Sequence, residues 1–184
     1  YFECRIATGQ SVIFSGSTEQ IDPAGLEAAF NAELSRRSHK IDFLSCLRHS
    51  ARQFIARQGD RTEVVAGYPW FGRWGRDTFI ALPGITLTQG GIESCQEVID
   101  TMTREMRDGL FPNMGTAYNS VDSPLWFFWT LQALEPHIGG PDAIWQKYGR
   151  HMKDILGAYR RGIGEHIRVH ENLLVWASNP HLAM

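Results

Sequence analysis

Cysteine is scarce in this chain of 184 residues, and its three cysteines show no CxxC spacing. They are Cys4, Cys46 and Cys95. An odd, unpaired set implies neither a disulfide framework nor a zinc site, so we expect a reducing compartment, the cytoplasm. No apolar run approaches the roughly 18 residues that span a bilayer, and the first ten residues lack a signal-peptide pattern. No membrane partner is therefore expected.

Neither sign of charge is in excess, because 18 Lys and Arg stand against 20 Asp and Glu, with a formal net charge of −2. Nucleic acids and anionic membranes attract basic surfaces, so this balance argues against both as main partners. The GxSxG signature of serine hydrolases is absent, as are the glycine patterns that bind nucleotides. No cofactor is therefore expected.

Aromatic residues, by contrast, are abundant, with six Trp and ten Phe in a chain that is 43% hydrophobic. This composition is typical of a globular domain with a core. Aromatic side chains bury much area in a core, and they also form flat apolar platforms on which sugars and bases bind. Both uses stay open at this point.

Apolar residues at helical spacing predict a mainly α fold of about six helices. Asp22-Pro23 predicts the start of the first one, since a capping Asp followed by Pro is typical of a helix N-terminus. Further apolar stripes cover residues 41–55, 92–106 and 144–163. Residues 123–140 are apolar nearly all round and are expected to be buried on most sides. A helix that begins near Asp77 is expected to be interrupted at Pro83-Gly84.

Strands are expected only near the two ends of the chain. Residues 1–18 predict two short strands around a Gly-Gln turn, as the close of a β unit, and residues 165–184 predict a hairpin with Glu171-Asn172 at its turn. The two longer connections, residues 60–75 and 108–121, hold the Trp, Gly, Asn and Asp residues. Binding residues concentrate on loops that a rigid scaffold supports. These two loops are therefore the candidate site.

The first loop belongs to the stretch 66–84, AGYPWFGRWGRDTFIALPG, in which five aromatic residues surround two arginines, Arg73 and Arg76, and Asp77. One interpretation is that Asp77 caps the helix that follows. The other is that Arg76 and Asp77 hold two hydroxyls of one sugar while Trp70 or Trp74 stacks on its face. The aromatic residues favour sugar binding, because a helix cap does not need them.

Asp77 could serve as a catalytic acid or as an acceptor of hydrogen bonds. Burial among aromatic residues would favour the acid, whereas the neighbouring Arg73 and Arg76 favour the ionised carboxylate. With two arginines so close in sequence, we expect the ionised form. Asp77 is therefore predicted to accept hydrogen bonds from sugar hydroxyls.

The second loop lies in the stretch 109–128, GLFPNMGTAYNSVDSPLWFF. Its candidate binding residues are Asn113, Tyr118, Asn119 and Asp122. Asp122 could instead be only an N-terminal helix residue, with Asn119 and Ser120 near the cap. If the helices that follow the two loops pack side by side, both loops face the same end of the bundle. His166 and His170 could ligate a metal, but nothing nearby completes a shell, and no metal is expected.

Three motifs, WFGRWGRDTFIALPG, GLFPN and YNSVDSPLWFF, occur here in this order. Together they resemble the C-terminal glucosidase domain of glycogen debranching enzymes, the amylo-α-1,6-glucosidases, particularly of the bacterial and archaeal type. The resemblance runs from about residue 40 to the end. It implies a partial (α/α)6 toroid of antiparallel helix pairs, a six-hairpin glycosidase fold whose loops at one end form the active site. It implies hydrolysis of α-1,6-linked glucose with inversion and without a metal.

The resemblance also implies roles for single residues. The pattern Trp-x-Arg-Asp is similar to that of glucoamylases, in which the Arg-Asp pair holds the terminal glucose, so Arg76 and Asp77 would bind substrate. The family's acid follows a TWMD-like motif that is expected beyond Met184, with the base farther on. Asp77 or Asp122 are the fallback catalytic candidates. The 184-residue chain is expected to be a truncated piece that is inactive alone.

The expected organisation is a remnant of an N-terminal β domain, residues 1–20, followed by the first part of the toroid, residues 21–184. The expected partner is a branched α-glucan, glycogen or its limit dextrin, and a homodimer could form through the open edge of the barrel. Three alternatives stay open: a non-catalytic glucan-binding module, another (α/α)6 glycosidase of the glucoamylase or trehalase kind, and a structural helical domain whose aromatics are only core.

Overall fold

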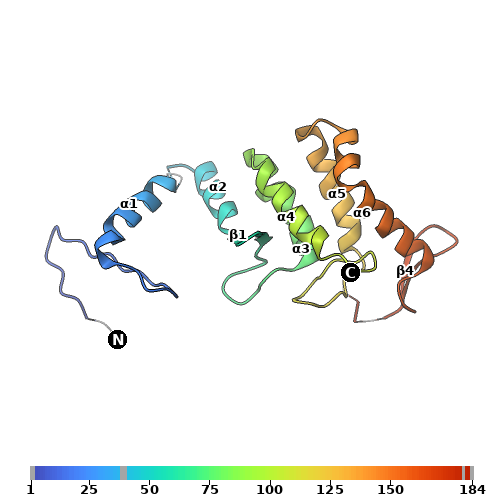
Figure 1. Cartoon of the computed structure of the whole chain (residues 1–184), viewed down its shortest axis with the longest axis horizontal. Coiled ribbons are helices and arrows are strands. Elements are labelled where there is room, and N and C mark those ends of the chain that lie inside the picture. Colours follow the sequence, from blue (N-terminus) through green and yellow to red (C-terminus); the bar gives the residue numbers. More distant parts are fainter. Residues whose placement is uncertain (1–2, 38–40, 180, 183–184) are drawn as a thin grey trace. The chain divides into compact units, whose positions relative to one another are not determined.

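The chain is mainly helical in the computed structural model, which describes residues 3–37, 41–179 and 181–182. Six α-helices and two two-stranded sheets lie within these residues, as Figure 1 shows. The chain divides into two compact units, Tyr1–His49 and Ser50–Met184. No helix of the described ranges is long and apolar enough to cross a membrane. The expectation of a mainly α fold is therefore confirmed.

The described residues at the start of the first unit form no strand. Residues 3–20 contain a turn in which Ala7 O accepts a hydrogen bond from Gln10 N, with Gly9 at a φ of 85°, but no strand. The two strands expected over residues 1–18 are therefore wrong for the described residues. Two strands alone are at best marginally stable, because their apolar face has nothing to pack against.

The helix start predicted at Asp22-Pro23 is confirmed. Asp22 Oδ1 accepts a hydrogen bond of 2.9 Å from Ala24 N at the start of a short 3-10 helix, η1 (Pro23–Gly25), which continues into α1 (Leu26–Arg36). Helix α2 (Phe43–Gln53) follows. The apolar stripe predicted over residues 41–55 is too long for this helix, because Phe54 lies beyond its end.

The second unit opens with a hairpin that replaces part of the loop expected at residues 60–75. Strands β1 (Ile55–Gln58) and β2 (Arg61–Val64) pair antiparallel, and Gln58 faces Arg61 across a two-residue turn. Gly59 stands in this turn at a φ of 60°. Gly59-Asp60 between two short strands is a hairpin signal. This dipeptide is the feature of the sequence that predicts the turn. Thr62 N donates to Thr101 Oγ1, and this bond connects β2 to the helix Ile92–Arg104.

Four helices carry the core of the second unit, and Figure 1 shows them as neighbours. They are α3 (Gly75–Ile85), α4 (Ile92–Arg104), α5 (Ser123–Leu134) and α6 (Pro141–Arg161), with 3-10 turns η2 (Leu87–Gln89) and η3 (Glu135–His137) between the members of each pair. Three rings at the centre, Phe79, Phe111 and Phe127, pack with centroids 4.7–5.5 Å apart.

The helical stripes predicted over residues 92–106 and 144–163 are largely confirmed, because their middle residues are buried. In α4 these are Cys95, Ile99 and Met102, and in α6 they are Ile144, Tyr148, Ile155 and Tyr159. The prediction that residues 123–140 are buried on most sides is confirmed for α5. Leu125, Trp129 and Gln132 form one exposed stripe, and the other residues of this helix are buried or half-buried.

Helix α3 runs through Pro83 and Gly84, so the expected interruption there is wrong. Proline has no N–H, so Phe79 O four residues earlier loses its helical partner. Thr130 Oγ1 of α5 donates to this carbonyl at 2.8 Å. A hydroxyl from the neighbouring helix thus satisfies the group that proline leaves unpaired.

The hairpin near the C-terminus is confirmed. Strands β3 (Ile167–Val169) and β4 (Val175–Ala177) pair antiparallel. The turn includes Glu171-Asn172, as predicted, and Leu174 N donates to Asn172 Oδ1 at 3.1 Å within it.

Candidate functional site

The two loops predicted to carry function contact each other at the N-termini of α3 and α5, which pack side by side. Gly75 N donates to Asn113 O at 3.0 Å, and Trp74 and Met114 form an isolated β-bridge. A Cβ atom on Gly75 would lie 2.3 Å from Pro112 O, so only glycine permits this approach. The expectation that both loops face one end of the helices is confirmed.

Asn113 is a buried connector between the loops. Its Oδ1 accepts from Arg76 N at 3.3 Å, and its Nδ2 donates to Asn119 Oδ1 at 3.2 Å. Since the free N–H groups of a helix N-terminus need acceptors, Asn113 serves α3 as a cap from another segment.

Asp77 does not cap α3. The N-cap position of this helix is Trp74, and Asp77 lies in the first helical turn with an exposed side chain. No hydrogen bond or ion pair of the Asp77 carboxylate occurs among the residues that the structure describes. The capping interpretation is therefore wrong, and the carboxylate is available to a ligand.

Asp122 is held by three donors. Arg76 Nε lies 3.0 Å and Trp126 Nε1 3.1 Å from its Oδ2, and Ser120 Oγ donates to its Oδ1 at 3.0 Å. The Asp122 side chain does not cap α5, because Ser120 Oγ is the atom that accepts from Ser123 N. Asp122 thus fixes the Arg76 guanidinium beside the exposed Asp77.

Arg73 faces away from this group, contrary to the reasoning that paired it with Asp77. Its side chain is 10% exposed, and its guanidinium lies 2.9 Å from Glu63 Oε1 and 2.6 Å from Glu105 Oε2. Arg61 bridges the same two carboxylates at 2.7 and 2.5 Å. These four residues form an ion-pair ring, two Arg and two Glu, that carries no net charge.

The ring shifts the pKa of two of its members. The hydrogen bond to Glu63 and the charges of Glu105 and Glu63 raise the pKa of Arg61. Burial disfavours the charged form of Glu105, but the hydrogen bond and charge of Arg73 and the charges of Arg61 and Arg104 outweigh burial and lower the pKa of Glu105. Elsewhere in the core, burial raises the pKa of the Cys95 thiol to about 11, so Cys95 is no thiolate nucleophile near neutral pH.

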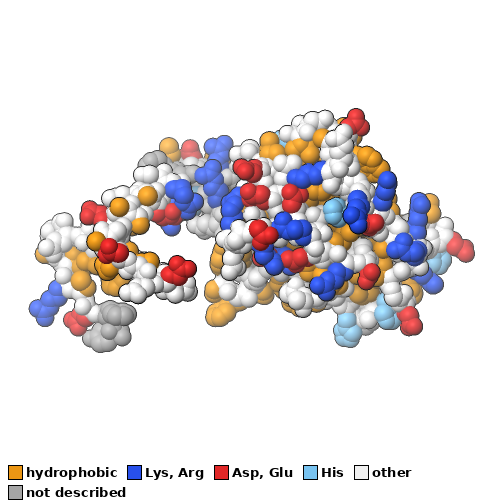
Figure 2. Space-filling view, viewed as in Figure 1, with side chains coloured by type: hydrophobic (Ala, Val, Ile, Leu, Met, Phe, Trp, Pro, Cys, Tyr) orange, Lys and Arg blue, Asp and Glu red, His pale blue; other side chains and the backbone are white. Residues whose placement is uncertain are grey.

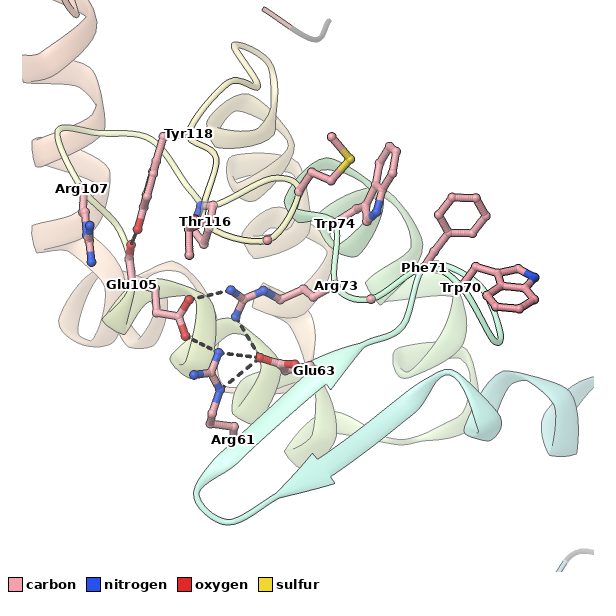
Figure 3. A pocket seen from close by; sticks show the side chains of 14 residues that line it. Arg61, Glu63, Trp70, Phe71, Arg73, Trp74, Glu105, Arg107, Thr116 and Tyr118 are labelled. Carbon is pink, nitrogen blue, oxygen red and sulfur yellow. Dashed lines mark hydrogen bonds and ion pairs between the residues drawn. The ribbon is translucent and has the colours of Figure 1, made fainter.

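A pocket of about 740 Å³ opens above the ion-pair ring. Figure 3 shows Trp70, Phe71 and Trp74 on one side of it and Arg107 and Tyr118 on the other. Tyr118 OH donates to Glu105 O at 2.7 Å, and the Arg107 guanidinium lies 5.3 Å from the centre of the Tyr118 ring. The ion-pair ring thus forms the floor, and aromatic groups together with Arg107 form the walls.

Three of the predicted site residues line this pocket: Trp70, Trp74 and Tyr118. The other five, Arg76, Asp77, Asn113, Asn119 and Asp122, lie outside its lining. The sequence reasoning missed Arg61, Glu63, Glu105 and Arg107, which line the pocket too. Arg61 and Glu63 come from β2, Glu105 is the C-cap residue of α4, and Arg107 lies in the turn that follows. No local motif marked these four residues.

Metal ligation has no support in the described part of the chain, which contains no group of three or more His, Cys, Asp or Glu residues that could hold an ion. His166, one of the two histidines considered as ligands, has its Nδ1 3.0 Å from Ser178 Oγ. Figure 2 shows acidic and basic side chains intermixed on the visible face of the second unit.

Comparison with known proteins agrees with the motifs. The glycogen debranching enzyme of Saccharomyces cerevisiae is 35% identical over 85 residues, which are 41% of this chain and 5% of the yeast protein. The chain thus spans a small part of that relative. The family model described as amylo-alpha-1,6-glucosidase matches residues 49–183. Since this match covers more than half of the chain and confirms the resemblance, the chain belongs to the amylo-alpha-1,6-glucosidase family.

Proposed function

We propose that this chain forms the sugar-binding part of a glycosidase domain that hydrolyses α-1,6-linked glucose at the branch points of a glycogen-like glucan, with inversion. Its membership of the family and the name of the yeast relative support this reaction class. The helix pairs α3–α4 and α5–α6 would be part of an (α/α)6 toroid. A homodimer, a cytoplasmic location and the β-domain remnant at residues 1–20 stay predictions.

The observation that carries the proposal is the exposed Asp77 carboxylate beside a fixed arginine. Asp122 holds Arg76 through an ion pair of 3.0 Å, and Asp77 follows Arg76 in the first turn of α3. A carboxylate only accepts and a guanidinium only donates hydrogen bonds. Together they match adjacent hydroxyls of one glucose, and Trp74, which precedes the helix, offers an aromatic face to the same sugar.

Asp122 suits a holding role better than proton transfer. Its two oxygens already accept from Arg76, Trp126 and Ser120. A general acid or base must exchange its proton with the substrate, and an oxygen bound to fixed donors is poorly placed to do so. The proposal therefore assigns substrate binding to Arg76 and Asp77, and it assigns neither the acid nor the base of the inverting pair to Asp122.

Calorimetric titration of the full chain with a limit dextrin tests this proposal. Asp77→Asn should weaken binding about tenfold or more, because a hydrogen bond to a charged group contributes about 1.5–3 kcal/mol. Asp142→Asn is the matched control, since Asp142 is also an exposed carboxylate in a first helical turn, that of α6. It should bind as the unchanged chain does.

Unchanged binding by Asp77→Asn, or no binding by the unchanged chain, would contradict the assigned sugar site. Glucose should be measured in the same samples. Glucose released by the 184-residue chain would show that Asp77 or Asp122 is catalytic after all. The non-catalytic alternative predicts binding but no glucose release, even from a longer protein that contains this chain.

A further inference from the structure

We propose that Tyr159, a buried residue near the end of α6, is a positioning residue for the pair of Arg76 and Asp122 beside the sugar site. The inference rests on the proposed function. It adds α6 as a third segment of the chain to the two loops that form the candidate site.

The Tyr159 hydroxyl holds the peptide group directly before Asp122. Tyr159 OH donates a hydrogen bond to Val121 O, and both residues are buried. The peptide group that joins Val121 to Asp122 is planar, so a bond to its carbonyl oxygen also fixes the direction in which the Asp122 Cα follows. Because both residues are buried, water is a poor substitute for the hydroxyl. The backbone position of Asp122 therefore depends on Tyr159.

The side chain of Asp122 carries this position on to Arg76. Its Oδ2 lies 3.0 Å from Arg76 Nε and 3.1 Å from Trp126 Nε1. Both donors meet the same oxygen, so a shift of the Asp122 backbone bends or lengthens both bonds, and hydrogen bonds weaken steeply as they bend. The Arg76 guanidinium would then be less fixed beside Asp77. Tyr159 therefore acts on a bound sugar through Asp122 and Arg76.

A second contact holds the same loop, residues 108–121, on α6. Gly109 near its start has a φ of 75°, and a Cβ there would lie 2.5 Å from Ala158 Cβ and 3.3 Å from Ile155 Cα. The loop backbone thus lies directly on the helix at the residue before Tyr159. The loop is anchored to α6 near both of its ends, and Tyr159 provides the anchor next to Asp122.

Tyr159 donates its hydrogen bond throughout the ordinary range of pH. Burial raises the pKa of the Tyr159 hydroxyl, and the negative charge of Asp122 raises this pKa further, because both disfavour the phenolate. A changed affinity in a Tyr159 variant therefore reports the lost hydrogen bond and not a change of protonation.

The test combines calorimetric titration of the full chain with proton–nitrogen NMR spectra of the isotope-labelled protein. Tyr159→Phe keeps the ring and removes only the hydroxyl. It should weaken binding of a limit dextrin about fivefold or more, because a misplaced binding group loses much of its effect. It should also move the Nε1–H resonance of Trp126, which bonds to the Asp122 carboxylate. Trp126→Phe assigns that resonance.

Tyr148→Phe is the matched control, because Tyr148 is another buried tyrosine of α6. Its OH donates to Asp100 Oδ1 of α4 at 3.0 Å and not to a loop of the site. Urea denaturation should show a similar loss of stability in the two variants. Tyr148→Phe should leave the dextrin affinity within about twofold and the Trp126 resonance in place. A merely structural role of Tyr159 predicts this result for both variants.

Two results would overturn the inference while the proposed function stands. One is a Trp126 resonance that stays in place in Tyr159→Phe. The other is a dextrin affinity of Tyr159→Phe equal to that of Tyr148→Phe when Asp77→Asn still weakens binding. If the unchanged chain does not bind the dextrin, the proposed function fails, and the Trp126 resonance still decides whether Tyr159 positions Asp122.

Discussion

Gly75 is the residue at which the two loops of the site come closest. Pro112 O lies where a side chain at this position would begin, and Ser123 Oγ would be 3.3 Å away. The bond from Gly75 N to Asn113 O depends on this approach. A methyl group at position 75 would push the two loops apart and so change the geometry of the Arg76–Asp122 pair.

Gly75→Ala should lower the free energy of unfolding by about 1–3 kcal/mol, since a group forced into packed structure displaces the backbone. Gly84→Ala is the control within the same helix, because a Cβ there has no heavy atom within 4 Å. It should raise stability by about 0.5–1 kcal/mol, the usual gain of Ala over Gly inside a helix. Urea denaturation measures both, and equal effects would contradict this account.

At the scale of elements, α3 and α5 are joined by a hydrogen bond that compensates for the proline inside α3. Pro83 leaves Phe79 O without a helical donor, and Thr130 Oγ1 supplies one. Both Phe79 and Thr130 are fully buried, so water cannot replace the hydroxyl. The bond therefore helps to set how the two helices that carry the site residues pack together.

Thr130→Val should destabilise the protein by about 1–3 kcal/mol, because it leaves a buried carbonyl unsatisfied. Thr88→Val is the comparison, since Thr88 Oγ1 makes a similar bond to Gly84 O at an exposed position. Thr88→Val should lower the free energy of unfolding by no more than about 0.5 kcal/mol. Thermal unfolding of the two variants distinguishes these values. A Thr130→Val protein as stable as the Thr88→Val protein would show that the hydrogen bond from Thr130 to Phe79 O does not stabilise the fold.

At the scale of the whole molecule, the two units differ in what holds them together. Helix α1 has no buried residue among its 11, and Phe30 and Leu34 of its apolar face are exposed. The second unit has a continuous core around Phe79, Phe111 and Phe127. The family match from residue 49 onwards covers this second unit.

Hydrogen exchange should therefore be uneven along the chain. Amides of α1 should exchange with little protection, because short helices without tertiary packing are marginal in water. Amides of α5 should be protected close to the limit of global unfolding. Mass spectrometry of native-state exchange measures both, and similar protection of the two helices would show that α1 is stabilised by contacts that the structure lacks.

The sequence by itself determined the features that depend on local pattern. The stripes of α4 and α6, the helix start at Asp22-Pro23 and the turn at Glu171-Asn172 follow from periodicity and capping chemistry, which involve residues a few positions apart. The three motifs were also enough to identify the family. Each of these signals is contained in a short window of the chain.

Only the tertiary structure decided which charged groups meet. Adjacency in sequence suggested that Arg73 faces Asp77, but its partners are Glu63 and Glu105, 10 and 32 residues away. Arg76 likewise pairs with Asp122, and Asn113 rather than Asp77 caps α3. A buried guanidinium must find carboxylates wherever packing brings them, because leaving it unpaired is costly. Sequence spacing carries no information about that packing.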